Sequence, residues 1–215
     1  MNKSKYVWEN DETHSGYAYN GSVWKKSQVD FLFKFIDEKF KFKTTGSKCL
    51  DIGCNSAFNL MTFKNCYPNK NNEYYGFDLN NTALSIAKEN VPEGKFKKCN
   101  FLLENPLLSF EDNFFDICFS TWVLSHLNTT NYRENLIKEM VRVSKRGIIY
   151  EAWDDHFCKN FENLPCLSSK SDEKEFNVVV FDDYTAYSKF INFEKVVTKD
   201  KSALFYWDKT NEKKN

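Results

Sequence analysis

Apolar residues along the chain alternate between helical spacing and short continuous runs bounded by turn residues. The helical spacing predicts helices at about Val23–Phe40, Phe58–Cys66, Thr82–Val91 and Tyr132–Val143. The apolar runs predict strands at about Ser47–Gly53, Tyr74–Asp78, Phe96–Cys99, Phe114–Ser120, Ile148–Glu151, Phe193–Thr198 and Ala203–Trp207. A further strand-like run at Val178–Phe181 precedes a short helical pattern at Asp182–Phe190.

Strands and helices alternate through residue 151, and two strands then follow around a tight turn. This order predicts an α/β fold with a mostly parallel sheet, helices on both faces and a C-terminal antiparallel hairpin. The length of 215 residues suits one domain. We expect an N-terminal arm or lid over residues 1–21, the domain over 22–209 and a loose tail over 210–215.

The first predicted strand runs into a glycine turn and then into a helix N-terminus. This arrangement forms a site for a nucleotide-like ligand. Gly53 lets the backbone approach the ligand because it has no Cβ. Asp51, at the end of the strand, either orients the turn or accepts a hydrogen bond from a ligand ammonium. Asn55 or Ser56 is expected to cap the helix.

The stretch Asp51-Ile52-Gly53-Cys54 resembles the first motif of class I S-adenosylmethionine-dependent methyltransferases. The family usually has glycines where Asn55 and Ala57 stand; Asn tolerates the left-handed conformation, and Ala57 adds one methyl group. The resemblance implies a seven-stranded sheet and S-adenosyl-L-methionine as cofactor, with S-adenosyl-L-homocysteine as product. It assigns Asp51, Gly53, Cys54 and Asn55 to the cofactor site.

The residues that follow the second and third strands extend this resemblance. Asp78 ends the second strand, 25 positions after Gly53, and can bind both ribose hydroxyls of the cofactor. Its alternative role is to cap the next helix. Leu79 is expected to lie against the adenine. Asn100 and Phe101 stand where the family contacts the adenine, although Asn100 could instead simply turn a loop.

The segment from Phe114 to Leu127 resembles the family's fourth motif. Ser120 lies at the carboxyl end of its strand, where its backbone carbonyl can receive the methionine ammonium. Trp122 is expected to wall the acceptor pocket. His126 is a candidate general base because the pKa of a histidine lies near neutrality, or it is a hydrogen-bonded structural residue.

The segment after the fifth strand concentrates acids and rings. It offers Glu151 as a second candidate catalytic residue and Trp153 and Asp154 as candidate acceptor contacts, or it is a solvated loop. The aromatic N-terminal arm is either frayed or a lid, and as a lid it would bring Tyr19 to the acceptor.

Composition narrows the possible partners. Lys and Arg number 30 and Asp and Glu number 30, so the net charge is zero, which argues against broad binding of nucleic acid or of anionic membrane. No apolar run is long enough to span a bilayer, and no signal core opens the chain. The seven cysteines include no Cys-x-x-Cys pair, which favours a reduced, cytoplasmic protein. His156, Cys158 and Cys166 lack a fourth ligand, so no metal is expected.

The sequence therefore predicts a methyltransferase acting on a small molecule, at an oxygen of a sugar, phosphoryl or secondary-metabolite intermediate. The family's Asn/Asp-Pro-Pro-Tyr/Phe signature for planar nitrogen acceptors is missing where Ser120-Thr121-Trp122-Val123 stands. Two alternatives remain: a non-catalytic subunit that binds S-adenosylmethionine, and a nicotinamide-dependent enzyme, although Gly-x-Gly-x-x-Gly is absent. The sequence makes no prediction of oligomeric state.

Overall fold

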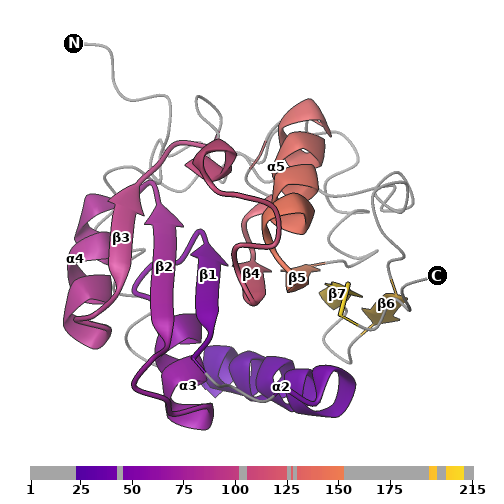
Figure 1. Cartoon of the computed structure of the whole chain (residues 1–215), viewed down its shortest axis with the longest axis horizontal. Helices are drawn as coiled ribbons and strands as arrows, with labels where there is room; N and C mark the ends of the chain where they lie inside the picture. The colour runs from indigo at the N-terminus through magenta and orange to yellow at the C-terminus, as the bar shows by residue number, and fades with distance from the viewer. Residues whose placement is uncertain are drawn as a thin grey trace, which may run out of the picture. The chain divides into compact units, whose positions relative to one another are not determined.

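The computed structural model describes residues 23–42, 46–101, 106–124, 127, 130–152, 194–197 and 202–210 (Figure 1). The chain divides into two compact units. Residues 1–99 and 115–119 form the first unit, and residues 100–114 and 120–215 form the second unit.

The first unit is built on parallel strands. Its elements are α2 (Val23–Phe40), β1 (Lys48–Ile52), α3 (Phe58–Cys66), β2 (Glu73–Asp78), α4 (Asn81–Asn90), β3 (Lys95–Lys98) and the start of β4 (Ile117–Thr121). Here β1 pairs with β2, and β2 with β3, both in parallel, which gives the strand order β3-β2-β1-β4. Figure 1 shows α4 alongside β3 and β2. Because β1 and β2 are parallel neighbours, their carboxyl ends lie at the same edge of the sheet.

Asp116 joins the beginnings of β1 and β4. Its Oδ2 accepts a hydrogen bond from the Lys48 amide at 2.9 Å, and its own amide donates to the Lys48 carbonyl at 2.9 Å. This pair lies at the amino ends of the strands, away from the edge where parallel sheets bind ligands. Asp116 therefore has a structural role.

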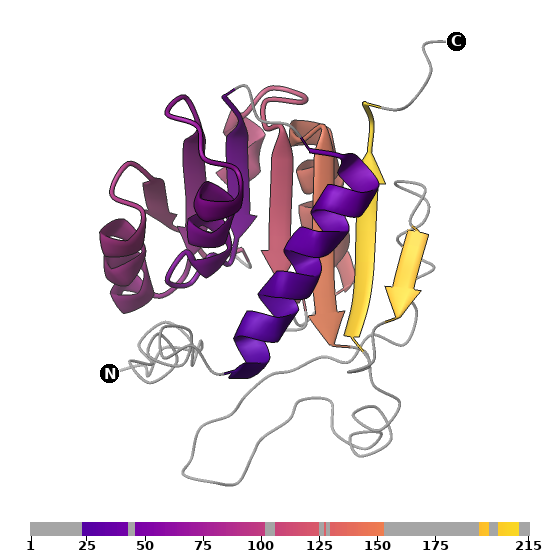
Figure 2. The same cartoon turned by 90° about the horizontal axis from the view of Figure 1, so that it is seen from below.

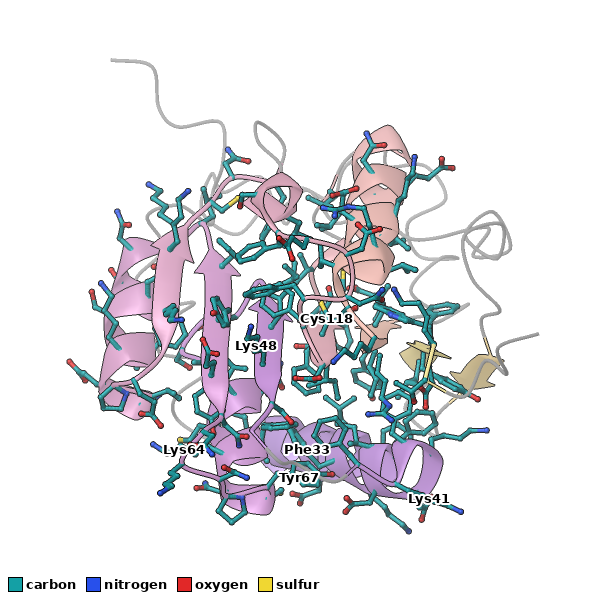
Figure 3. The ribbon with its side chains drawn as sticks, in the orientation of Figure 1. Phe33, Lys41, Lys48, Lys64, Tyr67 and Cys118 are labelled. Carbon is teal, nitrogen blue, oxygen red and sulfur yellow. The ribbon has the colours of Figure 1, made fainter. Side chains whose placement is uncertain are left out.

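Aromatic side chains from α2 and α3 form the centre of the first unit's core. Phe33 contacts Phe63 and Tyr67 with ring centroids 6.3 Å apart in both pairs, and Phe33 and Phe119 are 6.0 Å apart. Figure 3 shows Phe33 and Tyr67 side by side. The Tyr67 hydroxyl donates to Asp37 at 2.5 Å, so the ring is packed inside while its polar tip is paired.

The second unit ends in antiparallel strands. Its described elements are η2 (Pro106–Ser109), the last two residues of β4, α5 (Thr130–Val143), β5 (Arg146–Ala152), β6 (Glu194–Val197) and β7 (Ser202–Asp208). β7 pairs antiparallel with both β5 and β6, and Figure 2 shows the arrows of β7 and β6 in opposite directions. Gly147 faces Trp207 across this ladder, and a Cβ there would lie 1.9 Å from Cζ2 of Trp207.

The sequence predicts this architecture well. The mostly parallel sheet and the C-terminal antiparallel hairpin are confirmed, with seven strands among the described residues. Helix α2 and helix α3 have the predicted bounds, and the other described elements differ by one to three residues at their ends. The short helix η2 was not predicted. The predicted elements at Val178–Phe181 and Asp182–Phe190 lie outside the described residues, as do the predicted arm over 1–21 and residues 211–215 of the tail.

One predicted helix cap is wrong. The residue before α3 is Ala57, in the left-handed conformation, and no side chain caps the helix there. Neither Asn55 nor Ser56 takes the N-cap position, because the left-handed turn places Ala57 directly before Phe58, the first helical residue. Asn80, and not Asp78, takes the N-cap position of α4, since its side chain accepts a hydrogen bond from the Ala83 amide at 2.9 Å.

Candidate functional site

The loop between β1 and α3 is a tight turn with three residues at positive φ. Gly53, Asn55 and Ala57 have φ values of 66°, 48° and 59°. Gly adopts this conformation freely and Asn tolerates it, whereas Ala pays a steric cost. The Cys54 amide donates to the Phe77 carbonyl at 3.0 Å, which fastens the loop to β2.

Asp78, the last residue of β2, holds the same loop by its side chain. Its Oδ2 accepts a hydrogen bond from the Asn55 amide and its Oδ1 from the Asn80 amide, both at 2.8 Å. Burial raises the pKa of Asp78, and the backbone amides of Asn80, Asn55 and Leu79 oppose that rise. A carboxylate has about four acceptor positions, so Asp78 can hold the loop and still accept from ligand hydroxyls.

Asp51 lies in β1, two residues before Gly53, and is fully buried. Its Oδ1 accepts a hydrogen bond from Nδ2 of Asn59 at 3.2 Å, whereas its Oδ2 has no hydrogen-bond partner among the described residues. Burial raises the pKa of Asp51 from 3.8 to about 8; the Asn59 hydrogen bond opposes this and the charge of Asp78 adds to it. An unpartnered acid in a buried place is costly, so a cationic ligand group at Oδ2 would stabilise its charged form.

Gly76 in β2 gives the loop its close approach to the strand. A Cβ at Gly76 would lie 2.6 Å from Cδ1 of Phe96 and 2.7 Å from Sγ of Cys54. Burial, followed by the charges of Asp78 and Asp51, raises the pKa of the Cys54 thiol well above its usual value. The thiol is therefore neutral, and Cys54 contributes its backbone and its bulk to the site.

The candidate residues of the second unit lie after β3, at the end of β4 and directly after it, and at the end of β5. Asn100 and Phe101 are half-buried, while Ser120 is fully buried at the end of β4. Within the described residues, the Ser120 hydroxyl has no hydrogen-bond partner. Trp122 has φ of 60°, and its amide donates to the Tyr150 carbonyl at 2.9 Å.

Glu151 is buried, and its carboxyl group contacts backbone. Oε1 accepts hydrogen bonds from the amides of Val123 at 2.8 Å and Leu124 at 2.9 Å. The structure thus brings Trp122 and Glu151 together in the second unit, and it brings Asn55 and Asp78 together in the first unit. The other predicted site residues, Tyr19, His126, Trp153 and Asp154, lie outside the described residues.

Sequence reasoning missed Asn59. It lies in the first turn of α3 on the buried side and pairs with Asp51. The sequence does offer one signal for this pair. Asn59 stands beside the apolar positions Leu60 and Phe63 of a short helix, and a buried amide side chain requires a hydrogen-bond partner.

Two negative findings concern only the part of the chain that the structure describes. None of its helices has the length and apolar character needed to cross a membrane. No group of three or more His, Cys, Asp or Glu residues in that part is arranged to hold a metal ion.

These residues fit S-adenosylmethionine. Asp51 offers an unpartnered buried acceptor for the ammonium, Asp78 offers a carboxylate at the end of β2 for the ribose hydroxyls, and Gly53 adopts the positive φ that the turn between them requires.

Known proteins are similar to this chain in sequence and in fold. Residues 50–150 match the family model described as a methyltransferase domain. Over 111 residues the chain is 28% identical to the tRNA (carboxymethyluridine(34)-5-O)-methyltransferase of Arabidopsis thaliana, a match that covers 51% of this chain and 24% of that protein. The chain thus matches about a quarter of the length of this relative.

Two solved structures share the fold. The PH0226 protein from Pyrococcus horikoshii OT3 superimposes with a TM-score of 0.62 at 18% identity, over 87% of this chain and 92% of that chain. The TehB-like SAM-dependent methyltransferase from Corynebacterium glutamicum gives a TM-score of 0.58 at 15% identity, over 92% and 99%. The motif, the fold and the match over residues 50–150 together support a class I S-adenosylmethionine-dependent methyltransferase domain with S-adenosylmethionine as its cofactor.

Proposed function

We propose that this protein transfers the methyl group of S-adenosylmethionine to an oxygen atom of a small-molecule acceptor. The observation that carries the cofactor half of the proposal is the pair of carboxyl groups around the β1–α3 loop. Asp78 is fastened to the loop by the Asn55 amide, and Asp51 keeps one oxygen unpartnered among the described residues.

Each of these residues has a binding task. When bound, the cofactor supplies a methyl group already activated on a sulfonium. Asp51 binds the ammonium, Asp78 binds the ribose hydroxyls, and Leu79 lies beside the adenine. Because the donor is activated, alignment of donor and acceptor is the main task of the protein.

Two observations support an oxygen acceptor. The segment after β4 reads Ser120-Thr121-Trp122-Val123 and lacks the signature of planar nitrogen acceptors. The Arabidopsis relative is named for methyl transfer to an oxygen. The balanced charge of the chain, 30 basic against 30 acidic residues, favours a small acceptor over a polyanion.

A second candidate acceptor is a modified uridine in tRNA. The specific observation is again the Arabidopsis relative, whose name places its acceptor in tRNA. Both candidates share methyl transfer to oxygen and differ in the size and charge of the acceptor. The salt dependence of methyl transfer distinguishes the two acceptors. Transfer to tRNA should fall steeply as ionic strength rises, because RNA binding weakens with salt.

The test is transfer of labelled methyl from S-adenosylmethionine to a small-molecule extract and, separately, to total tRNA. Label in the small-molecule fraction that requires Asp78 supports the proposal; label in tRNA supports the second candidate. Mild base then distinguishes methyl esters, which release methanol, from methyl ethers and methylamines, which do not. No transfer to either pool, with cofactor binding intact, would favour the non-catalytic alternative.

A further inference from the structure

Three consecutive backbone amides after β4 are held by two consecutive residues of β5. The Trp122 amide donates to the Tyr150 carbonyl at 2.9 Å, and the amides of Val123 and Leu124 donate to Oε1 of Glu151 at 2.8 and 2.9 Å. Val123 and Leu124 are buried, as is Glu151. Buried amides without acceptors are destabilising, so Glu151 satisfies two groups that would otherwise oppose this backbone path.

The same path carries a strained residue. Trp122 has φ of 60°, in the left-handed region, which is rare for a bulky side chain. Its indole contacts the Tyr150 ring edge-to-face, with centroids 6.3 Å apart and an interplanar angle of 80°. Strained residues of this kind persist only where the surroundings fix them, and they concentrate at functional sites. Trp122 directly follows Thr121, at the carboxyl end of β4, where open α/β sheets bind ligands.

Oε1 of Glu151 does not suit a general base. A base needs an acceptor position directed at the proton that it removes. Oε1 already accepts from two amides, and the carboxyl group is buried. A side chain that accepts hydrogen bonds from two successive amides fixes the backbone conformation of those two residues.

We propose that Glu151 is a positioning residue, which fixes the Val123-Leu124 backbone and thereby sets Trp122 as a wall that determines acceptor specificity. The acceptor part of this inference rests on the proposed function. Glu151 then acts through Trp122 and transfers no proton. The matched substitution is Glu151→Gln, because a glutamine keeps an oxygen that can accept from both amides but cannot act as a base.

Amide hydrogen exchange tests the positioning role without any acceptor. We expect the amides of Val123 and Leu124 to exchange at least tenfold faster in Glu151→Ala than in the wild type, and within about threefold of the wild type in Glu151→Gln. The amides of Tyr75 and Phe77 in β2 are the internal reference for folding. Glu151→Asp, one methylene shorter, replaces the alanine variant if that variant does not fold. Unchanged protection in Glu151→Ala, or equal loss in both variants, would overturn the positioning role.

Methyl transfer to the small-molecule extract tests the functional part. We expect Glu151→Gln to keep the wild-type rate within about threefold and Glu151→Ala to lose rate chiefly through a raised KM. Trp122→Ala is expected to broaden the set of labelled products. A loss of about a hundredfold or more in kcat for Glu151→Gln, the size expected for removal of a general base, would overturn the inference. If the wild type transfers no methyl, the proposed function fails, while the exchange experiment still decides the role of Glu151.

Discussion

The carboxylate of Asp78 and the backbone of Asn55 are joined by a hydrogen bond of 2.8 Å between Oδ2 and the amide nitrogen, across 23 positions of the chain. This hydrogen bond holds the turn after β1 against the end of β2. Asp78 therefore has two tasks in our proposal: it binds the ligand, and it positions the β1–α3 loop beside that ligand.

Replacing Asp78 by alanine is expected to lower the affinity for S-adenosylhomocysteine by at least tenfold. The substitution removes the proposed contact with the ribose and unties the loop at Asn55 and Asn80. Asp78→Asn keeps one acceptor oxygen and should give an intermediate loss. Calorimetric titration measures both.

Asp116 provides the matched control, because it is also a carboxylate that accepts a backbone amide at 2.9 Å, but at the amino end of β4. Asp116→Ala should lower stability and leave the affinity unchanged. Equal affinity losses in the Asp78 and Asp116 variants would show that Asp78 acts on folding alone.

Asp51 should make stability depend on pH. Its pKa is raised in the folded protein from 3.8 to about 8, chiefly by burial. Between these values the native state holds a proton that the unfolded state has lost, so stability falls as pH rises from about 4 to 8 and is level above. Asp51→Asn lacks this proton. We therefore expect the wild type to lose stability relative to Asp51→Asn across this window by a few kcal/mol, since one pKa unit corresponds to about 1.4 kcal/mol.

Chemical denaturation of both proteins at pH 5, 6, 7 and 8 measures this difference. A constant difference in the free energy of unfolding across these four values would contradict the raised pKa of Asp51.

Asn59 should tune the pH at which the cofactor binds. The ligand ammonium prefers the charged form of Asp51, so affinity is expected to rise as pH approaches about 8. The hydrogen bond from Asn59 lowers the pKa of Asp51. Asn59→Leu removes this donor, so the rise in S-adenosylhomocysteine affinity should move to higher pH. Titrations of both proteins at several pH values measure the shift, and coincident curves would exclude Asn59 from this role.

The substitution Ala57→Gly is expected to stabilise the folded protein. Its φ of 59° is a left-handed conformation, in which a Cβ costs about 1–2 kcal/mol, partly offset by the greater entropy of unfolded glycine. Ala57→Gly should therefore raise the free energy of unfolding by about 0.5–1 kcal/mol. The control Ala87→Gly, inside α4, should lower it by about 1 kcal/mol. Thermal or chemical denaturation measures both, and a loss of stability in Ala57→Gly would rule out strain at this turn.

The sequence predicted the elements because their apolar periods are clear, and it predicted the cofactor segment because glycine, acid and helix start stand in a fixed order. Ala57 shows the limit of this reasoning. Its neighbours Asn55 and Ser56 have good capping side chains, yet the left-handed turn, which is bonded to β2, decides where α3 begins.

Long-range partners were not predictable in the same way. Glu151 was identified as a candidate acid from its place at the end of a strand, but its contacts with Val123 and Leu124 span 28 and 27 positions. Nothing in the local sequence specifies which backbone amides a buried carboxyl group will meet. Asn59 is similar, because only the fold shows that its amide faces Asp51.

We propose above all that the loop fastened by Asp78 is a working cofactor site. Calorimetric titration of the purified protein with S-adenosylhomocysteine, with NADH as the comparison ligand, tests it most directly. We predict micromolar binding of S-adenosylhomocysteine, a loss of at least tenfold in Asp78→Ala, and no binding of NADH. Absence of S-adenosylhomocysteine binding by a folded wild-type protein, or binding of NADH in its place, would contradict the account.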